Sequence, residues 1–181
     1  MLRQFFKDSA VYGAASILVR SASLLLVPFY TRVLIPDDYG VIDLLTIATS
    51  LIAVTVALEI AQAVARFFPE ATDSRQRVEY ASTSLWFSIA AYSLLLVGSV
   101  VFADPLSAWL LGTADRVAVF RVAMAATWFT GIFYLVQSQL RYSLQPRHYV
   151  VSSVVFSLTS LATSVLFVLV LGQGVIGVFY G

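Results

Sequence analysis

An arginine stands in the middle of the first long apolar segment, residues 9–30. As a helix rising about 1.5 Å per residue, this segment is roughly 33 Å long, enough to cross a hydrocarbon core about 30 Å thick. A central arginine opposes membrane insertion by about 2.5 to 3.5 kcal/mol, which is comparable with what the apolar residues of the segment supply together. We therefore expect Arg20 to face a protein interior or a watery cavity.

Small and hydroxyl-bearing residues share a helical face with Arg20. Tyr12 and Ser16 precede it at intervals of four residues, and Ser9 and Ser23 lie three residues beyond Tyr12 and Arg20 on the same face. The opposite face is almost wholly aliphatic. This pattern predicts a hydrophilic lumen to which Tyr12, Ser16 and Arg20 contribute. The alternative is that the serines only allow close helix packing while Arg20 snorkels or forms an internal ion pair.

Glu59 is the second charged candidate for the lumen. It shares one face of the second apolar segment with Thr55, Gln62 and Arg66. Counted from the ends of the two spans on the same side of the membrane, its depth is about 10 Å, against about 16 Å for Arg20, so the two side chains could pair or line one cavity. A static ion pair that fixes the register of the helices is the alternative.

Arg121 is the third candidate and lies about one turn inside the fourth apolar segment. Arg20 and Arg121 together would form a cationic cavity that attracts an anionic group, such as a lipid pyrophosphate or an acidic sugar. The alternative is that Arg121 snorkels to the lipid headgroups.

Other classes of site find little support. The chain has no cysteine and one histidine, His148, so disulfides, thiolate nucleophiles and Cys/His zinc sites are excluded. There is no Ser/His/Asp set and no pair of carboxylates at matching depth, so we expect neither an enzyme nor a cofactor. The basic residues lie between the apolar segments without forming a patch, which gives no reason to expect a nucleic-acid partner.

Composition indicates the fold class that must position these residues. Hydrophobic residues make up 60% of the 181, charged residues 12%, and the mean hydropathy is +0.88. Soluble domains are usually about 45 to 50% apolar. We therefore predict an all-α integral membrane protein with five complete transmembrane helices and the start of a sixth at 174–181. The five spans are expected at about 9–30, 40–65, 80–102, 117–138 and 150–171.

The connections between the spans carry further expectations. Asp37 and Asp38 should begin a helix after Pro36 rather than bind a metal. A polar loop is expected from 66 to 79, and Pro105 is expected to close the third span. Four serines at helical spacing in the fifth span predict close packing, namely Ser153, Ser157, Ser160 and Ser164.

The distribution of basic residues predicts the orientation. One side of the membrane has seven Lys and Arg residues beside the spans and the other has two, which places the N-terminus in the cytoplasm. The seven are Arg3, Lys7, Arg66, Arg75, Arg77, Arg141 and Arg147, and the two are Arg32 and Arg116. We expect a multi-pass protein of a bacterial or archaeal cytoplasmic (inner) membrane.

The segment from 29 to 40 resembles the polysaccharide flippases of the multidrug/oligosaccharidyl-lipid/polysaccharide exporter superfamily. The first span of that family commonly ends in Tyr-Thr-Arg-hydrophobic-Leu-x-Pro-x-x-Tyr-Gly. This sequence matches the pattern at Tyr30, Thr31, Arg32, Leu34, Pro36, Tyr39 and Gly40. Residues 139–147 are similar to the family's loop after span four, except at Ser143 and Gln145, and residues 171–177 are similar to its entry to span six.

The resemblance implies transport of a lipid-linked oligosaccharide or polysaccharide repeat unit from the cytoplasmic to the outer leaflet. Family members work by alternating access between two bundles of six or seven helices, so this chain, 1–181, would be the N-terminal part and supply most of one bundle. Cationic cavity residues are typical of the family, which makes Arg20 the first choice for substrate contact. The implied partners are the lipid-linked glycan, the bilayer and proteins of envelope polysaccharide assembly.

Three other functions remain open at the level of sequence. A cation-coupled drug exporter of the same superfamily would need acidic residues deep in the spans, where only Glu59 qualifies. An integral membrane enzyme of envelope assembly would be expected to have a large outer loop with paired catalytic residues. A non-transporting membrane protein that packs through the serines of the fifth span would follow if 181 residues were the full product.

Overall fold

The computed structural model describes residues 27–28, 30–56, 60–67, 70–71, 73–113, 115–143 and 145–181. Within these ranges the regular structure is entirely helical. The elements are α2 (Pro36–Val56), α3 (Ile60–Phe67), α4 (Ser74–Val101), α5 (Ala103–Leu111), α6 (Val117–Tyr142), α7 (Pro146–Val165), the π-helix η1 (Leu166–Val170) and α8 (Val175–Tyr180).

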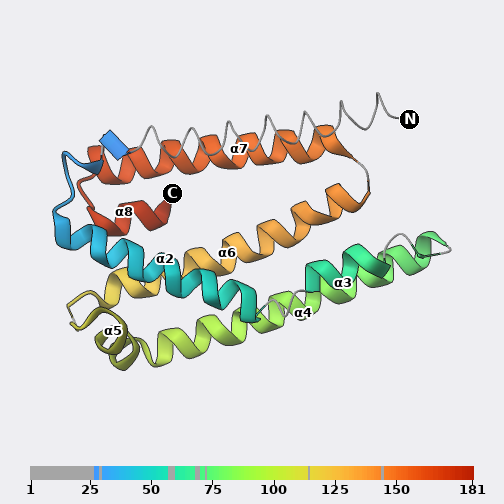
Figure 1. The fold of residues 1–181 in the computed structure, drawn as a ribbon, viewed down its shortest axis with the longest axis horizontal. Helices are drawn as coiled ribbons and strands as arrows, with labels where there is room; N and C mark the ends of the chain where they lie inside the picture. The colour runs from blue at the N-terminus through green and yellow to red at the C-terminus, as the bar shows by residue number, and fades with distance from the viewer. Residues whose placement is uncertain are drawn as a thin grey trace.

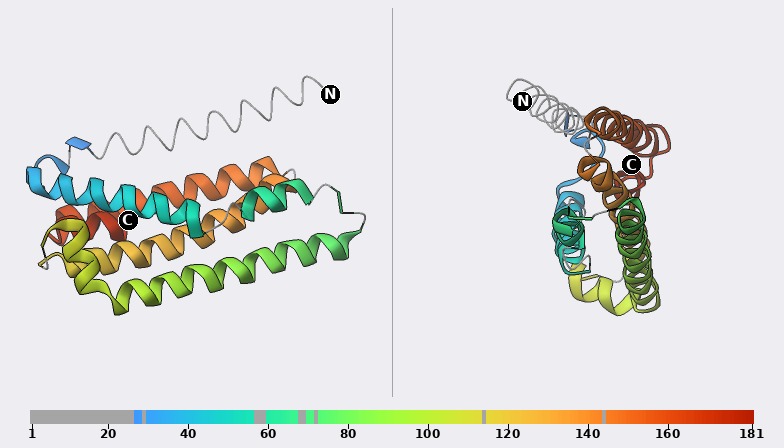
Figure 2. Two further views of the ribbon diagram at one scale, coloured as in Figure 1. Left: turned by 60° about the horizontal axis from the view of Figure 1, so that its bottom comes forward. Right: turned by 90° about the vertical axis from the view of Figure 1, so that its right-hand side faces the viewer.

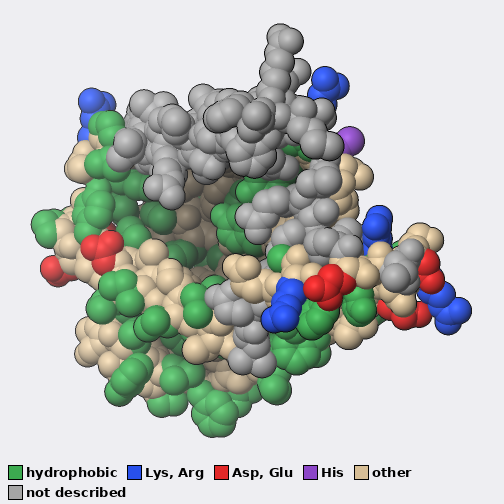
Figure 3. Space-filling model, turned by 45° about the vertical axis from the view of Figure 1, so that its right-hand side comes forward, with side chains coloured by type: hydrophobic (Ala, Val, Ile, Leu, Met, Phe, Trp, Pro, Cys, Tyr) green, Lys and Arg blue, Asp and Glu red, His purple; other side chains and the backbone are tan. Residues whose placement is uncertain are grey.

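The long helices run back and forth between two ends of a bundle (Figures 1 and 2). We call them the Asp38 end, where α2 and α6 begin and α5 and η1 lie, and the Ser74 end, where α4 and α7 begin. On the face shown in Figure 3, charged side chains gather toward the ends of the helices. The count of basic residues predicts that the Ser74 end is cytoplasmic.

Four described helices are long and apolar enough to cross a membrane: Pro36–Thr55, Ser74–Val101, Val117–Leu140 and Pro146–Val170. They correspond to the second to fifth predicted spans. The first predicted span, 9–30, lies almost wholly outside the described residues, so the count of five stays a prediction. Helix α8 lies where the start of a sixth span was predicted.

The start of α2 confirms the helix predicted after Pro36. Asp37 and Asp38 lie in its first turn, where a negative charge faces the positive end of the helix dipole. Asp38 Oδ2 also accepts a hydrogen bond from the backbone N–H of Ile35 at 3.3 Å. The two aspartates therefore stabilise a helix terminus, as expected.

Helix α4 begins at Ser74, six residues before the predicted span, so the predicted polar loop 66–79 is wrong in its second half. Asp73 is the N-cap, and its side chain accepts a hydrogen bond of 2.7 Å from the backbone N–H of Gln76. An aspartate at this position satisfies an otherwise unpaired donor of the first turn. The cap allows the helix to start in a polar segment that hydropathy assigns to a loop.

The third span ends where it was predicted to end, because α4 stops at Val101. Pro105 lies in the first turn of a further short helix, α5, where the missing N–H has no intrahelical acceptor. Helix α5 ends at Gly112, whose φ of 71° is the left-handed conformation that glycine adopts without strain. The chain therefore turns back at the Asp38 end through a short helix.

The buried apolar core lies toward the Asp38 end. Its members come from the residues before α2, from α2, α5 and the first two turns of α6, and from α8. They are Leu34, Leu45, Ala103, Val119, Phe120, Ala123, Met124 and Val175. Short elements thus close this end of the bundle around the longer helices.

Helix α8 packs closely against η1. A Cβ on Gly177 would lie 2.9 Å from the backbone of Phe167 and Val168, so this position has no room for a side chain. The serines of α7 also make contacts between helices, as their spacing predicted: Gln137 Nε2 of α6 donates to Ser153 Oγ at 2.8 Å, and the hydroxyls of Tyr30 and Ser164 are hydrogen-bonded. Small residues therefore set the helix distances here.

Candidate binding cavity

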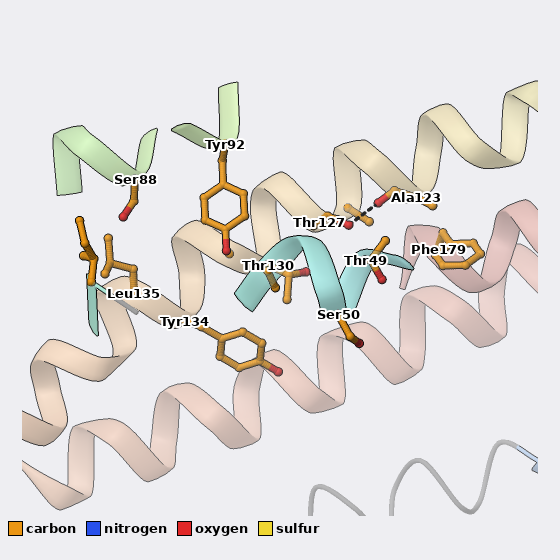
Figure 4. Close-up of a pocket in the computed structure, with 14 residues that line it drawn as sticks. Thr49, Ser50, Ser88, Tyr92, Ala123, Thr127, Thr130, Tyr134, Leu135 and Phe179 are labelled. Atoms are coloured by element: carbon orange, nitrogen blue, oxygen red, sulfur yellow. Dashed lines mark hydrogen bonds between the residues drawn. The ribbon is translucent and has the colours of Figure 1, made fainter. Parts of the chain in front are cut away.

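A cavity of about 430 Å³ is lined by residues of α2, α4 and α6, together with Ile60 of α3 and Phe179 of α8 (Figure 4). This volume falls in the usual range for a ligand-binding pocket. None of its 14 described lining residues is charged. Seven carry a hydroxyl group: Thr49, Ser50, Ser88, Tyr92, Thr127, Thr130 and Tyr134. We call this space the hydroxyl cavity.

Three of these hydroxyls are occupied within their own helices. Thr49 and Ser50 donate to the carbonyl oxygen of Thr46 at 3.1 and 2.7 Å, and Thr127 donates to that of Ala123 at 2.8 Å. Such local bonds satisfy the hydroxyl hydrogen and leave the oxygen lone pairs available as acceptors.

The other four hydroxyls have no hydrogen-bond partner in the described part of the chain. They belong to Ser88 and Tyr92 of α4 and to Thr130 and Tyr134 of α6. Figure 4 shows the Tyr92 side chain extending from α4 toward α6. A polar group inside the membrane costs free energy when it has no hydrogen-bond partner. We therefore expect water or a polar ligand to form hydrogen bonds with these four hydroxyls.

Gly131 provides the space for the Tyr92 ring. A Cβ on this glycine would lie 2.5 Å from Tyr92 Cζ and 2.8 Å from both Cε atoms. The ring therefore lies directly over the backbone of α6, with its hydroxyl at the cavity. The position of Tyr92, and with it the shape of the cavity, depends on the absence of a side chain at residue 131.

The lining can bind a neutral polar ligand. Each hydroxyl can donate one hydrogen bond and accept two, and the tyrosine rings add flat apolar surfaces. A sugar presents the same mixture of hydroxyls and apolar C–H faces. The described lining has no carboxylate, imidazole, thiol or amine, so the chemistry it offers is recognition through hydrogen bonds and ring contacts.

A second hollow, of about 450 Å³, lies between α3 and α4 toward the Ser74 end. Its surface is predominantly apolar, with Glu79 at the end nearest the start of α4. The residues are Ile60, Ala63, Val64, Phe67, Glu79, Tyr80, Thr83, Ser84 and Phe87. We call it the α3–α4 groove. Ile60 lines both this groove and the hydroxyl cavity.

Arg121 lies on another side of α6, outside the lining of the hydroxyl cavity. Its guanidinium forms an ion pair with Asp104 of α5, with 3.7 Å between Nη2 and Oδ2, and its side chain is 49% exposed. Asp104 is thus a neighbour that the sequence prediction did not include. The role of Arg121 in substrate contact stays a prediction.

The remaining predicted site residues cannot be placed. Tyr12, Ser16, Arg20 and Glu59 all lie outside the described residues. The predicted cationic lumen and the predicted pair between Arg20 and Glu59 are therefore neither confirmed nor contradicted.

A second ion pair closes the Asp38 end. Arg116 Nη1, in the turn before α6, lies 2.7 Å from Asp38 Oδ1 of α2. The two side chains are 31% and 15% exposed, so solvent screens them only partly. This contact joins the starts of two membrane-crossing helices at the end where the apolar core lies.

Sequence reasoning missed the hydroxyl cavity because it gave the charged residues priority. The signal was present as hydroxyl residues at helical spacing within apolar spans. Ser88 and Tyr92 are four residues apart, and Thr127, Thr130 and Tyr134 follow at intervals of three and four.

The comparisons with known proteins agree with this picture. A family model described as "Polysaccharide biosynthesis protein" matches residues 5–181. No curated protein and no solved structure matches the chain. With its apolar membrane-crossing helices and a family match over nearly its whole length, the chain belongs to the polysaccharide biosynthesis protein family and is a multi-pass membrane protein of polysaccharide synthesis.

Proposed function

We propose that this protein is a flippase, which moves lipid-linked oligosaccharides or polysaccharide repeat units from the cytoplasmic to the outer leaflet by alternating access. The hydroxyl cavity is the observation that carries the proposal. A sugar headgroup is too polar to cross hydrocarbon unaided, because its hydroxyls would lose their hydrogen bonds to water. A cavity lined by hydroxyls between membrane-crossing helices supplies replacement bonds at that depth.

The described lining also favours transport over catalysis. A neutral lining can hold a glycan and release it unchanged, whereas an enzyme would need an acid, a base or a nucleophile beside the sugar. We therefore propose a carrier that does not alter its substrate. Its partners are the lipid-linked glycan, the bilayer and other proteins of envelope polysaccharide assembly.

Arg20 and Glu59 belong to the proposal as predicted cavity residues, with Arg20 holding a pyrophosphate or an acidic sugar. The proposed setting is a bacterial or archaeal cytoplasmic membrane with the N-terminus in the cytoplasm. The chain is proposed to form most of one bundle of a two-bundle transporter. Alternating access would then expose the cavity first to the Ser74 end and later to the Asp38 end.

The test removes single hydroxyls without changing side-chain volume much. Thr130→Val and Tyr134→Phe each delete one hydroxyl that has no partner in the described structure. The matched control is Thr159→Val, at an exposed position of α7 outside the cavity. We measure how fast the glycan of a lipid-linked oligosaccharide reaches the outer leaflet, where an impermeant lectin binds it.

We expect Thr130→Val and Tyr134→Phe to slow flipping by about 5- to 10-fold each, since a lost hydrogen bond to a ligand costs about 1 kcal/mol. Thr159→Val should flip at the rate of the unsubstituted protein. Unchanged flipping in both cavity variants would contradict the assignment of the hydroxyl cavity. An absence of flipping by the unsubstituted protein would contradict the proposed function itself.

A further inference from the structure

We propose that the α3–α4 groove binds an acyl chain of an anionic phospholipid, whose phosphate group pairs with Arg66 near the surface of the membrane. The groove is a mainly apolar channel between two helices, and a guanidinium lies at one of its ends. A phospholipid joins an acyl chain to a charged headgroup in the same order. The inference does not depend on the flippase activity, because the ligand is a lipid of the bilayer and not the transported substrate.

The groove runs from the Ser74 end toward the middle of the bundle. Along α4 its lining extends from Glu79 and Tyr80, in the second turn, to Phe87, about 10 Å further on. Along α3 it extends from Ile60 to Phe67, and the ring centroids of Phe67 and Tyr80 are 6.3 Å apart. These two rings mark the end nearer the Ser74 end, which we call the mouth of the groove.

The lining between the two ends suits a hydrocarbon chain. Val64 on the floor is 7% exposed, whereas Phe67 and Phe87 on the rim are 47% and 40% exposed. The hydroxyl of Ser84 on the floor donates to the carbonyl oxygen of Ala81 at 2.8 Å, so it needs no polar ligand. A flexible chain that enters from the bilayer across the open rim can fill this space through van der Waals contacts without leaving the hydrocarbon.

Arg66 supplies a positive charge at the mouth. Its side chain is exposed, and its Cζ lies 5.9 Å from the centroid of the Phe67 ring. The cation–π attraction holds the guanidinium there and leaves its N–H donors available. Among the described residues, no carboxylate lies within ion-pair distance of Arg66, and Glu79 across the mouth is paired with Arg75 at 3.0 Å. A phosphate group would therefore supply the anion for Arg66.

The position of this charge favours a phospholipid over the lipid-linked glycan. The hydroxyl cavity adjoins the inner end of the groove, where Ile60 lines both spaces. A glycolipid with its sugars in that cavity would place its phosphate at the inner end, whereas Arg66 lies at the mouth. A phospholipid of the surrounding leaflet has its phosphate at the membrane surface and its chains directed inward. That is the direction in which the groove runs from Arg66.

The side of the membrane favours an anionic headgroup. The Ser74 end is predicted to be cytoplasmic, and basic pockets between membrane helices on that side bind anionic lipid headgroups. A zwitterionic phospholipid carries its own ammonium group, which competes with Arg66 for the phosphate. We therefore expect the groove to be enriched in anionic lipid, and the enrichment to fall as salt is added, because Arg66 is exposed to solvent.

The experiment places a photoreactive p-benzoylphenylalanine at one of two neighbouring positions of α4. Phe87 lies on the rim of the groove, whereas Trp86 is 70% exposed and outside the groove, so position 86 reports the surrounding bilayer. The full chain is irradiated in vesicles of equal parts phosphatidylglycerol and phosphatidylethanolamine. Mass spectrometry gives the ratio of the two lipids among the adducts at each position.

We expect the ratio of phosphatidylglycerol to phosphatidylethanolamine to be about 5-fold higher at position 87 than at position 86, the effect of one cation near the membrane surface. Arg66→Gln should lower the ratio at position 87 to that at position 86. The matched control is Arg147→Gln, which removes an exposed charge in the first turn of α7, also at the Ser74 end, and should leave the ratio unchanged.

Three results would overturn the inference. The first is an equal ratio at positions 86 and 87, and the second is an enrichment that survives Arg66→Gln. The third is a glycan-bearing adduct that replaces the phospholipid adduct at position 87 when lipid-linked glycan is added to the vesicles. Neither of the first two results touches the proposed function, because flipping is not part of the measurement, and the third would assign the groove to the substrate.

Discussion

The two ends of the bundle are built differently. At the Asp38 end, the apolar core, the ion pair between Asp38 and Arg116 and the close packing of α8 on η1 hold several elements together. At the Ser74 end, α3 and α4 leave an apolar groove, and the pair between Arg75 and Glu79 is 87% and 59% exposed. The comparison indicates that packing holds the Asp38 end of the bundle together, while the hydroxyl cavity borders an open groove on the side of the Ser74 end.

The largest expected change in stability comes from adding a side chain at Gly177, where α8 packs against η1 at the Asp38 end. Gly177→Ala puts a Cβ 2.9 Å from the backbone of Phe167 and Val168, and backbone cannot rotate away. We expect the free energy of unfolding to fall by about 2 to 3 kcal/mol, near the top of the range for overpacking. Thermal unfolding of the purified protein in detergent measures it, with Gly40→Ala, where nothing lies within 4 Å, as the control.

The next effect comes from the ion pair at the same end. Asp38→Asn keeps an acceptor at the start of α2 but leaves Arg116 without its charged partner, so we expect a loss of about 1 to 2 kcal/mol. Asp37→Asn is the matched control in the same helical turn, and about 0.3 to 1 kcal/mol should be lost there through the helix dipole.

A double-mutant cycle isolates the pair itself. If the ion pair contributes as described, adding Arg116→Gln to Asp38→Asn should cost little more than either change alone. Losses that simply add would mean that the two side chains stabilise the Asp38 end independently.

In the cavity between the ends, Gly131→Ala should separate stability from transport. The new Cβ would displace the Tyr92 ring, which can move, while alanine gains about 0.5 to 1 kcal/mol as a helix residue. We expect the free energy of unfolding to stay within about 1 kcal/mol of that of the unsubstituted protein. We expect flipping to be several-fold slower. The control is Gly98→Ala, because nothing lies within 4 Å of a Cβ at that position; it should raise the free energy of unfolding and leave flipping unchanged. Equal flipping rates in the two variants would argue against a role of the hydroxyl cavity in transport.

The smallest effect is expected at the Ser74 end. Arg75→Ala removes an i,i+4 pair that solvent screens strongly, so the free energy of unfolding should change by no more than about 0.5 kcal/mol. A loss as large as that of Asp38→Asn would mean that the Ser74 end is held as firmly as the Asp38 end, which contradicts the comparison. Chemical or thermal unfolding of the two variants side by side decides between these outcomes.

Much of the helical layout follows from the sequence because it depends on local signals. Apolar length predicts the membrane-crossing helices, and Pro36 with the aspartates after it predicts the start of α2. Helix α5 was missed because Pro105 breaks a helix interior but is compatible with a first turn, and hydropathy does not separate the two cases. The early start of α4 needed the cap at Asp73 to be recognised.

The site was less predictable because it depends on which helix faces meet. The spacing of Ser88 and Tyr92 is visible in the sequence, but only packing shows that they face Thr130 and Tyr134 of α6. The surroundings of Arg121 likewise depend on α5, which supplies Asp104, and hydropathy does not predict that helix. Tertiary contacts, rather than residue type, thus decide which polar residues share a cavity.

The most direct test of this account measures access to the hydroxyl cavity, and the absence of native cysteines gives it a clean background. Thr130→Cys puts a single thiol in the cavity, and Ser107→Cys puts one in the closed Asp38 end, where Ser107 is 0% exposed. We predict that a hydrophilic thiol reagent labels the Thr130 variant several-fold faster, and that lipid-linked glycan slows this labelling. Equal rates in the two variants, unaffected by the glycan, would contradict the account.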